Sequence, residues 1–402
     1  MHILEIPSFF PPYGGLFCLD QAKALAALGH EVRILSNVQL GASVGLKDYL
    51  TLPYGRYEHL MDGIMVYQSY QRGVPKMIRH NVSRWVTIVQ SMFADYEKRY
   101  GLPDIIHAHC AKWAGYAAML ISREYGIPYV ITEHLPKEIL ALEFGVPPNE
   151  ALGQKHESWN STVWQIASLR QSYQQAGMVI HVSDEQEEEL SCYFESDYHH
   201  LTISNIIDVD YFAYRERQSL HGRPFRVCCL ALMVERKGYD VLFAAFSRLL
   251  QLGANVQLHI AGQGTNGQIG RHLMKEAGCE EHVVVHGALS KEGVRKLLYA
   301  SDALVLASRG ESQGLVLLEA MSTGIPAIST EAIPRSVRPE CGFRYVPVDD
   351  VDALAVEMLK AVEHPRSDGR MLSEWVRRKA SPQVVGQQIA TVLTQVVREQ
   401  KK

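Results

Sequence analysis

The segment from Glu311 to Glu319, with the sequence ESQGLVLLE, places two carboxylates around a glycine turn. Gly314 can supply a tight turn, and the run Leu315 to Met321 has the composition of a helix. The first turn of a helix has unpaired backbone N–H groups and a positive dipole end, so this segment could hold a phosphate. Carboxylates do not bind phosphate, so Glu311 and Glu319 would instead accept hydrogen bonds from hydroxyls such as those of a sugar. The alternative is that Glu311 caps the helix and Glu319 is a solvated surface acid.

A second segment whose residues could bind a ligand is Glu235-Arg-Lys-Gly238, which follows an apolar strand-like run. A lysine at a strand end, beside a glycine that opens a helix, can reach a phosphate as a point charge, so Lys237 is a candidate phosphate ligand. Gly14 and Gly15 follow the first strand-like run and would let the backbone approach a ligand closely. Each segment could equally be an ordinary turn between a strand and a helix, and the residue types leave that alternative open.

Three histidines stand at the ends of predicted strands. His107 and His109 are two residues apart in one strand, so their side chains point to the same face. A His-x-His pair can bind zinc, but no further ligands are evident at neighbouring strand ends, so we expect no metal site. His134 follows the next strand and is placed to donate a hydrogen bond to a substrate hydroxyl. His107 is more typical of a histidine that is satisfied within a core.

The glycines at 262, 264 and 267 fit the GxGxxG pattern of dinucleotide-binding proteins. They follow the second predicted strand of the second half, whereas this fingerprint normally opens its domain. We therefore do not expect NAD to bind here.

The elements that position these residues alternate along the chain as apolar strand-like runs and amphipathic helical runs, which predicts α/β domains with parallel sheets covered by helices. The predicted strands are 2–6, 32–35, 64–69, 105–109, 129–132, 178–182, 201–204, 225–230, 256–261, 282–286, 303–306 and 327–329. The stretch 209–223 is polar and irregular, so we predict two doubly wound domains, 1–208 and 224–381, joined by a linker at 209–223. Ligands of such sheets bind at the carboxyl ends of the strands, and the candidate residues above stand there.

The composition excludes several classes of protein. The 402 residues carry 40 Lys and Arg against 44 Asp and Glu, and this net charge of −4 argues against general nucleic-acid binding. The 7 cysteines include no CxxC pair, which is typical of a reducing compartment without a zinc ribbon. No run approaches the ~20 apolar residues of a membrane span, and the N-terminus lacks the basic lead of a signal peptide. We therefore expect a cytoplasmic protein. The basic start of the predicted helix 76–98 would allow peripheral contact with the inner face of a membrane, although a core-packed helix explains it as well.

The motifs and their order resemble the retaining glycosyltransferases of family 4, also called group 1 transferases, over nearly the whole chain. The segments that carry the resemblance are Gly14-Gly15, 104–109 (DIIHAH), 132–134 (TEH), 204–208 (SNIID), 236–238 (RKG), Gly287, Ser308, the Glu311/Glu319 pair and 324–326 (GIP). The resemblance implies the GT-B fold, in which two Rossmann-like domains with doubly wound parallel sheets have a cleft between them. The N-terminal domain would bind the acceptor and the C-terminal domain the nucleotide-sugar donor. A last helix, 382–399, would pack back on the N-terminal domain.

The resemblance also implies which residues contact the donor. The donor-binding set is Gly15, Lys237, Glu311, Ser312, Gly314, Leu315, Val316 and Glu319. Within it, Lys237, Gly15 and the backbone amides of 314–316 would contact the diphosphate, Glu319 the ribose, and Glu311 the sugar hydroxyls. His134 would position the donor sugar, so the implied catalytic residues are Glu311, His134 and Lys237. The nucleoside diphosphate sugar, with UDP or GDP, is a substrate, and neither a metal nor a cofactor is implied.

Two positions depart from the family pattern. The usual Gly-Arg after strand 225–230, whose arginine binds the diphosphate, is replaced by Ala231-Leu232, and Arg236 is a candidate substitute at a different spacing. The usual Gly-Gly and Glu after the Gly324 strand are replaced by 332–335, ending in Arg335. Both changes would weaken donor binding, alter the donor or make the protein a catalytically poor relative of the family.

The function implied is a metal-independent hexosyltransferase that retains anomeric configuration. It would move a sugar from a nucleoside diphosphate sugar to a glycan or lipid-linked acceptor in the synthesis of cell-surface polysaccharide or glycoconjugates. The loops 39–63 and 135–160 would select the acceptor, and we expect the second to order only around it. The alternatives are a non-catalytic partner protein with the GT-B fold and a nucleotide-sugar epimerase, which would convert the donor without an acceptor.

Overall fold

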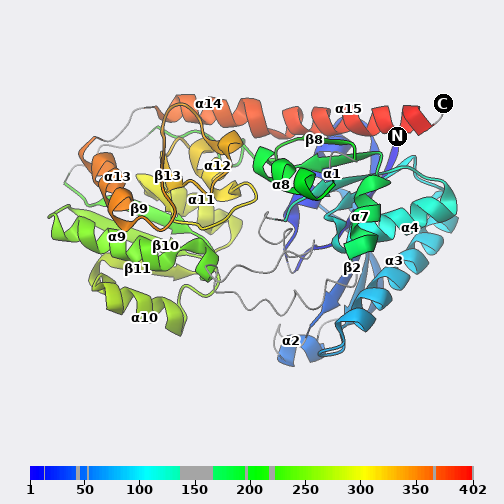
Figure 1. Cartoon of the computed structure of the whole chain (residues 1–402), viewed down its shortest axis with the longest axis horizontal. Coiled ribbons are helices and arrows are strands. Elements are labelled where there is room, and N and C mark those ends of the chain that lie inside the picture. Colours follow the sequence, from blue (N-terminus) through cyan, green and yellow to red (C-terminus); the bar gives the residue numbers. More distant parts are fainter. Residues whose placement is uncertain are drawn as a thin grey trace. The chain divides into compact units, whose positions relative to one another are not determined.

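The computed structural model describes residues 1–12, 14–41, 46–51, 54–135, 166–194, 198–216, 222–364 and 368–400. The chain forms two compact units: unit 1 comprises Met1–Ile206 and Pro382–Lys402, and unit 2 comprises Ile207–Ser381. Each unit is an α/β domain built on a mainly parallel sheet, as predicted (Figure 1). None of the described helices is both long enough and apolar enough to cross a membrane.

Unit 1 contains an eight-stranded sheet with the order β3-β4-β2-β1-β5-β6-β7-β8. The strands are β1 (His2–Pro7), β2 (Glu31–Leu40), β3 (Gly55–Met61), β4 (Ile64–Arg72), β5 (Ile105–His109), β6 (Tyr129–Glu133), β7 (Met178–His181) and β8 (His200–Thr202). The helices are α1 (Leu16–Ala27), α2 (Leu46–Thr51), α3 (Ile78–Tyr100), the π-helical turn η2 (Ala111–Gly115), α4 (Tyr116–Tyr125), α7 (Ile166–Gln174), α8 (Asp184–Phe194) and α15 (Pro382–Gln400). All pairings are parallel except that of β3 with β4.

Two apolar cores cover the faces of this sheet. Successive strand residues point to opposite faces, and Leu4 accordingly belongs to a core shared with α3, α4 and α7, whereas Ile3 belongs to one shared with α1 and α15. The helix that was expected at 382–399 is α15, and it packs on α1 within unit 1. The packing is close, because a Cβ on Gly386 would lie 2.9 Å from the Cβ of Ala24.

Unit 2 contains a six-stranded, fully parallel sheet with the order β11-β10-β9-β12-β13-β14. The strands are β9 (Phe225–Leu230), β10 (Val256–Ala261), β11 (Val283–Gly287), β12 (Ala303–Leu306), β13 (Ala327–Thr330) and β14 (Phe343–Val346). The α-helices are α9 (Tyr239–Gln251), α10 (Gln268–Ala277), α11 (Lys291–Ala300), α12 (Leu315–Ser322), α13 (Val351–Glu363) and α14 (Gly369–Ala380). Three 3₁₀ turns are η5 (Glu235–Lys237), η6 (Glu280–His282) and η7 (Arg335–Val337).

The unit boundaries differ from the predicted linker. Val209 and Phe212 lie within the predicted linker 209–223, yet both are buried in the apolar core of unit 2. Asp208 also belongs to unit 2, where it accepts a hydrogen bond from Lys291 at 3.0 Å. Two apolar residues within a polar stretch therefore pack the start of this segment into the core of unit 2.

Candidate functional site

Two loops meet at the carboxyl edge of the unit 2 sheet. β9 and β12 are parallel neighbours, so the loop after β9 and the loop after β12 leave the sheet side by side. The first loop turns through η5 to Gly238, which has a φ of 61°. A Cβ on Gly238 would lie 1.9 Å from the carbonyl oxygen of Ala307, so only glycine lets the loops touch. This contact places Lys237 beside Glu311.

The Glu311 carboxylate is the centre of a polar cluster at this edge. It is buried, with 9% of its surface exposed. Lys237 Nζ forms an ion pair with Oε1, and Ser308 Oγ donates a hydrogen bond to the same oxygen at 2.7 Å. The guanidinium of Arg236 lies 3.7 Å from Oε2. Glu311 does not cap α12, whose N-cap is Gly314, so the capping alternative for Glu311 does not hold.

The N-terminus of α12 directly follows this cluster. Gly314 adopts a left-handed conformation with a φ of 75°, and as a glycine it has no side chain with which to cap the helix. The first turn contains no acidic residue. The N–H groups of Leu315 and Val316 therefore belong to a helix end with a positive dipole. Glu319 lies half-buried in the second helical turn.

One residue that organises this edge, Arg309, was not singled out from the sequence. Its backbone N–H donates to the carbonyl of Arg236 at 2.7 Å, and its guanidinium donates to the carbonyl of Glu235 at 2.7 Å. The guanidinium also pairs with Asp240 at 2.6 Å and Asp349 at 2.7 Å. Arg309 thus fixes the η5 turn against the loop that carries Glu311, and only its neighbour Ser308 was part of a motif.

The structure also places the residues that depart from the family pattern. Leu232 is 48% exposed, so an apolar side chain occupies the position of the usual arginine. Arg236 donates a hydrogen bond to the carbonyl of Gly310 and approaches Glu311, so its charge is present at the same edge. Arg335 is exposed in η7.

In unit 1, Gly15 is required by the fold itself. It has a φ of 80°, and a Cβ there would lie 1.9 Å from the carbonyl oxygen of Phe9. It opens α1, whose Phe17 stacks on the ring of His134 with the centroids 3.8 Å apart. Gly15 and His134 are therefore carried by neighbouring segments of unit 1.

His134 is held by a buried carboxylate from the preceding residue. Glu133 Oε1 accepts from the backbone N–H groups of His134 at 2.9 Å and Leu135 at 3.0 Å. Its Oε2 accepts from Tyr173 at 2.5 Å and from the Ala111 N–H at 3.0 Å. These contacts fix the backbone at His134, and they were not expected from the sequence.

A second buried carboxylate, Glu5 of β1, lies between two histidines of β5. Glu5 Oε1 is 3.2 Å from His107 Nδ1, and Oε2 is 2.6 Å from His109 Nε2. These histidines lower the pKa of Glu5 to about 2 and outweigh the opposite effect of its burial. The pairing follows from register, because Glu5 is opposite His107 in the parallel pair of β1 and β5. A charged residue inside a short apolar strand is the one signal of this pairing that the sequence contains.

Among the described residues, this cluster has the side chains that could supply three ligands to a metal ion. Ligand atoms of Glu5, His107 and His109 all lie within 4.8 Å of one another. No further ligand beside the His-x-His pair was expected from the sequence, and Glu5 supplies one. In the structure these atoms are engaged with one another and with Thr132, whose Oγ1 is 2.7 Å from His107 Nε2.

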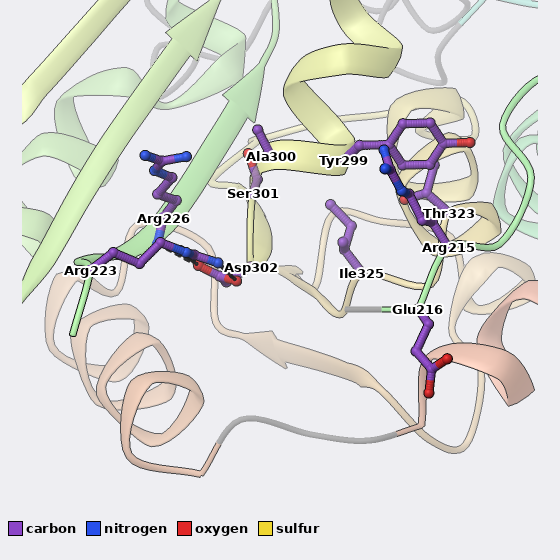
Figure 2. A pocket seen from close by; sticks show the side chains of 10 residues that line it. All are labelled: Arg215, Glu216, Arg223, Arg226, Tyr299, Ala300, Ser301, Asp302, Thr323 and Ile325. Carbon is purple, nitrogen blue, oxygen red and sulfur yellow. Dashed lines mark hydrogen bonds and ion pairs between the residues drawn. The ribbon is translucent and has the colours of Figure 1, made fainter. Parts of the chain in front are cut away.

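A pocket of about 190 Å³ in unit 2 lies away from this site (Figure 2). It is lined by residues at the amino ends of β9 and β12, including Arg223, Arg226 and Asp302. Asp302 accepts two hydrogen bonds from Arg223, at 2.6 and 2.8 Å, and one from the Arg226 N–H at 2.8 Å. These contacts link the starts of the two strands. The pocket is at the sheet edge opposite to Lys237 and Glu311, and it contributes nothing to their chemistry.

Comparison with known proteins gives the family. Residues 15–205 match the family description "Glycosyl transferase 4-like domain", and residues 224–364 match "Glycosyl transferases group 1". The fold and these matches define a glycosyltransferase with the GT-B architecture. The chain belongs to the group 1 glycosyltransferases, as its motifs indicated.

Individual relatives agree with this assignment. The chain is 26% identical to glycogen synthase from Mycobacterium tuberculosis over 431 aligned positions, which cover 98% of this chain and 94% of that protein. Sucrose-phosphate synthase from Thermosynechococcus elongatus has a similar structure, with a TM-score of 0.79 at 19% identity over 99% of this chain and all of that one. Anabaena HepE, solved in complex with UDP and glucose, gives a TM-score of 0.69 at 17% identity over 98% of this chain and 99% of that one. At these identities the structural likeness shows the fold alone.

The structure brings Lys237 together with Glu311, and it places Ser312, Gly314, Leu315, Val316 and Glu319 in the segment that follows. Gly15 and His134 lie in unit 1. The acceptor loop expected at 135–160 falls outside the described residues from 136 onward.

Proposed function

We propose that this glycosyltransferase moves a hexose from a nucleoside diphosphate sugar to a glycan or lipid-linked acceptor, with retention of anomeric configuration. The observation that carries the proposal is the Glu311 cluster beside the start of α12, where the N-cap residue is a glycine. Cationic groups and a helix N-terminus, suited to a diphosphate, stand there next to a carboxylate suited to sugar hydroxyls. Full-length similarity to a glycogen synthase supports a polysaccharide or glycoconjugate as the acceptor.

Each side chain at this edge has a chemical task in the proposal. Breaking the bond between sugar and diphosphate builds negative charge on the leaving phosphate. Lys237 and the amides at Gly314, Leu315 and Val316 stabilise that charge. Glu311 binds hydroxyls of the donor sugar and eases positive charge on the ring, and Glu319 binds the ribose. Gly15 and His134 of unit 1 are assigned to the donor by resemblance, and that assignment stays a prediction.

The reaction is proposed to need no metal ion. The charge that a divalent cation would supply to a diphosphate comes here from Lys237, Arg236 and the α12 dipole. The proton of the attacking acceptor hydroxyl passes to the leaving phosphate on the same face of the sugar. This route retains configuration without a protein nucleophile.

The test compares wild type with Glu311→Gln and Glu311→Ala, with UDP-glucose and GDP-mannose as donors. Release of nucleoside diphosphate is measured with and without an oligosaccharide acceptor. We expect turnover to fall at least ~100-fold in both variants, the scale of losing one charge-stabilising group. Turnover near the wild-type rate in both folded variants would show that Glu311 is not in the site.

A non-catalytic protein with the same fold is the second candidate. It is favoured by Leu232, whose apolar side chain occupies the place of the arginine that clamps the diphosphate in related enzymes. Retained nucleotide binding with no turnover of any donor would support this alternative. Introducing Leu232→Arg would then test whether the missing cation is the cause.

A further inference from the structure

One stretch of unit 1 carries positive charge without any acidic residue. No Asp or Glu occurs between positions 62 and 95, whereas four Lys or Arg residues stand there: Arg72, Lys76, Arg79 and Arg84. They lie at the carboxyl end of β4, in the first turns of α3 and in the segment between the two. The side chains of Lys76 and Arg79 are exposed. The whole chain has a net charge of −4, so this stretch differs in sign from the protein around it.

The other two guanidiniums are held in place by uncharged groups. Arg72 donates hydrogen bonds to the carbonyls of Tyr49 at 2.7 Å and Leu50 at 2.8 Å, which fixes α2 beside the end of β4 (Figure 1). Arg84 donates to the carbonyl of Arg72 at 2.9 Å and to Gln71 Oε1 at 3.0 Å. Within the described part of unit 1, neither Arg72 nor Arg84 forms an ion pair with a carboxylate. Their charges therefore add to those of the exposed basic residues.

Exposed apolar side chains stand next to these charges. The exposed fraction is 60% for Leu50, 59% for Tyr54, 51% for Met77 and 37% for Val74. Arg84 Nη2 lies 3.4 Å from the Tyr54 hydroxyl, and the Met77 N–H donates to the Val74 carbonyl at 3.2 Å. Apolar side chains that gather on a surface and are rimmed by polar groups mark a place where a partner binds.

The apolar face of α3 itself does not belong to this surface. Trp85, Val89 and Phe93 pack in the core between α3 and the sheet, and each is at most 1% exposed. Of the two explanations that the sequence leaves open for this helix, core packing therefore accounts for its apolar residues. The exposed apolar side chains come from α2, from the residue that precedes β3 and from the turn that leads into α3.

We propose that this patch docks unit 1 on the surface of a bilayer that contains anionic lipids. The docking patch comprises Leu50, Tyr54, Val74, Lys76, Met77 and Arg79. Aliphatic side chains at a bilayer surface enter the boundary between headgroups and acyl chains, where tyrosine is also favoured. Basic residues beside them attract anionic headgroups. A nucleic acid has the same negative charge but gives the aliphatic side chains nothing to enter, so the composition of the patch favours a bilayer.

The place of the patch in the fold connects it with the acceptor. β2 and β4 are parallel and end together, with Leu40 opposite Arg72, so the patch stands at the carboxyl edge of the unit 1 sheet. Gly15 and His134 follow β1 and β6 at the same edge. The consequence rests on the proposed function: a bilayer at this edge would present the headgroup of a lipid-linked acceptor to unit 1. The docking patch therefore favours a lipid-linked acceptor over a free glycan.

The test is co-sedimentation of the full-length protein with vesicles, without any donor. The vesicles contain either phosphatidylcholine alone or phosphatidylcholine mixed with phosphatidylglycerol. We expect the protein to sediment with the mixed vesicles at low salt, and to bind them less as salt screens the charges. No sedimentation with the mixed vesicles, or equal sedimentation with both kinds, would overturn the proposal.

A first pair of variants tests the charges of the patch. Lys76→Gln combined with Arg79→Gln should lower the affinity for the mixed vesicles at least tenfold, because each basic residue at an anionic surface contributes roughly fivefold. Lys98→Gln combined with Arg123→Gln is the matched control. It removes the same charge from exposed positions in the last turns of α3 and α4, away from the patch, and should leave binding unchanged. Equal losses in the two double variants would contradict the proposal.

A second pair tests the apolar part, which separates a bilayer from any other polyanion. Leu50→Ser combined with Met77→Ser keeps the charge and should lower the affinity for the mixed vesicles about tenfold. Leu252→Ser combined with Ile269→Ser is the control, since these side chains of unit 2 are 63% and 66% exposed and lie outside the patch. A loss in the charge variant without one in the apolar variant would show a purely ionic contact and would overturn the assignment to a bilayer.

The vesicle assay and the turnover assay fail separately. All substituted side chains are exposed, so we expect the variants to keep the Tm of the wild type. Vesicle binding that depends on the patch, with no cleavage of UDP-glucose or GDP-mannose, would confirm the docking patch and count against the proposed function. Donor cleavage by a protein that does not bind the mixed vesicles would support the transferase and overturn the docking patch.

Discussion

Replacing Lys237 by methionine tests the central ion pair of unit 2. The substitution keeps a long, flexible side chain and removes the charge that is proposed to stabilise the leaving diphosphate. Removing one preorganised group of this kind typically costs about 10²–10³ in turnover, or roughly 3–4 kcal/mol. We therefore expect kcat for donor cleavage to fall by about that factor.

The same substitution should also lower stability, by an amount that the structure limits. The side chains of Lys237 and Glu311 are 13% and 8% exposed, and breaking a buried pair on one side costs roughly 3–5 kcal/mol. Glu311 keeps a hydrogen bond from Ser308 at 2.7 Å and the Arg236 guanidinium at 3.7 Å, so we expect the lower part of that range or less, about 2 kcal/mol. In a unit of this size that corresponds to a fall in Tm of roughly 4–8 °C.

A double variant separates the two effects. Lys237→Met combined with Glu311→Gln removes both charges, and it should recover most of the lost stability while turnover stays low. Lys360→Met is the control, because Lys360 pairs with Glu357 at 2.6 Å on the surface of the same unit and should change neither property. The assays are initial rates with UDP-glucose and GDP-mannose, and thermal unfolding. Turnover within tenfold of wild type in folded Lys237→Met would refute the reasoning. Full recovery of turnover in the double variant would refute it as well.

Three further predictions concern the fold, its pH dependence and metals. Gly238→Ala should lower Tm far more than Gly253→Ala. Both positions have positive φ, but only at Gly238 would a Cβ lie 1.9 Å from a carbonyl oxygen. Equal losses of Tm in the two variants would show that backbone strain alone matters. Burial lowers the pKa of His181 to about 3, so His181 stays neutral in the folded protein while the unfolded chain takes up a proton below pH 6.5. Its contribution to stability is therefore complete above pH 6.5 and is lost as the pH falls toward 3. In His181→Gln the midpoint of urea unfolding should therefore depend less on pH between pH 7 and 4 than it does in the wild type. If the urea midpoint of His181→Gln falls with pH as steeply as that of the wild type, His181 does not cause the pH dependence of stability. Turnover of UDP-glucose should survive EDTA and extensive dialysis, and loss of activity that Mg²⁺ or Zn²⁺ restores would contradict the metal-independent mechanism.

Much of the fold followed from hydrophobic pattern. The predicted strands 105–109, 225–230, 256–261 and 303–306 match β5, β9, β10 and β12 residue for residue, because each is a short, largely apolar run between turn signals. β3 was missed inside the expected loop 39–63. All of its residues are exposed or half-buried at the sheet edge, so its sequence lacks an apolar run. β14 was missed as well, since its four residues include the polar Arg344.

The candidate site was predictable only where a single segment carries it. The turn at Gly314 and the helix after it are local, and both were expected. The contacts between Lys237 and Glu311, and between Glu5 and His109, join residues 74 and 104 positions apart. They depend on which strands are neighbours and in what register, and sequence spacing does not show this. Glu5 illustrates the point: its role follows from β1 lying beside β5, and its type alone does not reveal a partner.

Thermal unfolding with a panel of nucleotides tests most directly the claim that unit 2 binds the diphosphate of a nucleotide sugar. The panel comprises UDP, GDP, ADP and NAD in the presence of EDTA, each with wild type and Lys237→Met. A ligand at 100 times its dissociation constant stabilises by ~2.7 kcal/mol, which corresponds to a shift of several degrees. We predict that one nucleoside diphosphate raises the Tm of the wild type and that Lys237→Met loses most of the shift. A shift with NAD alone, or none with any nucleoside diphosphate, would contradict the account.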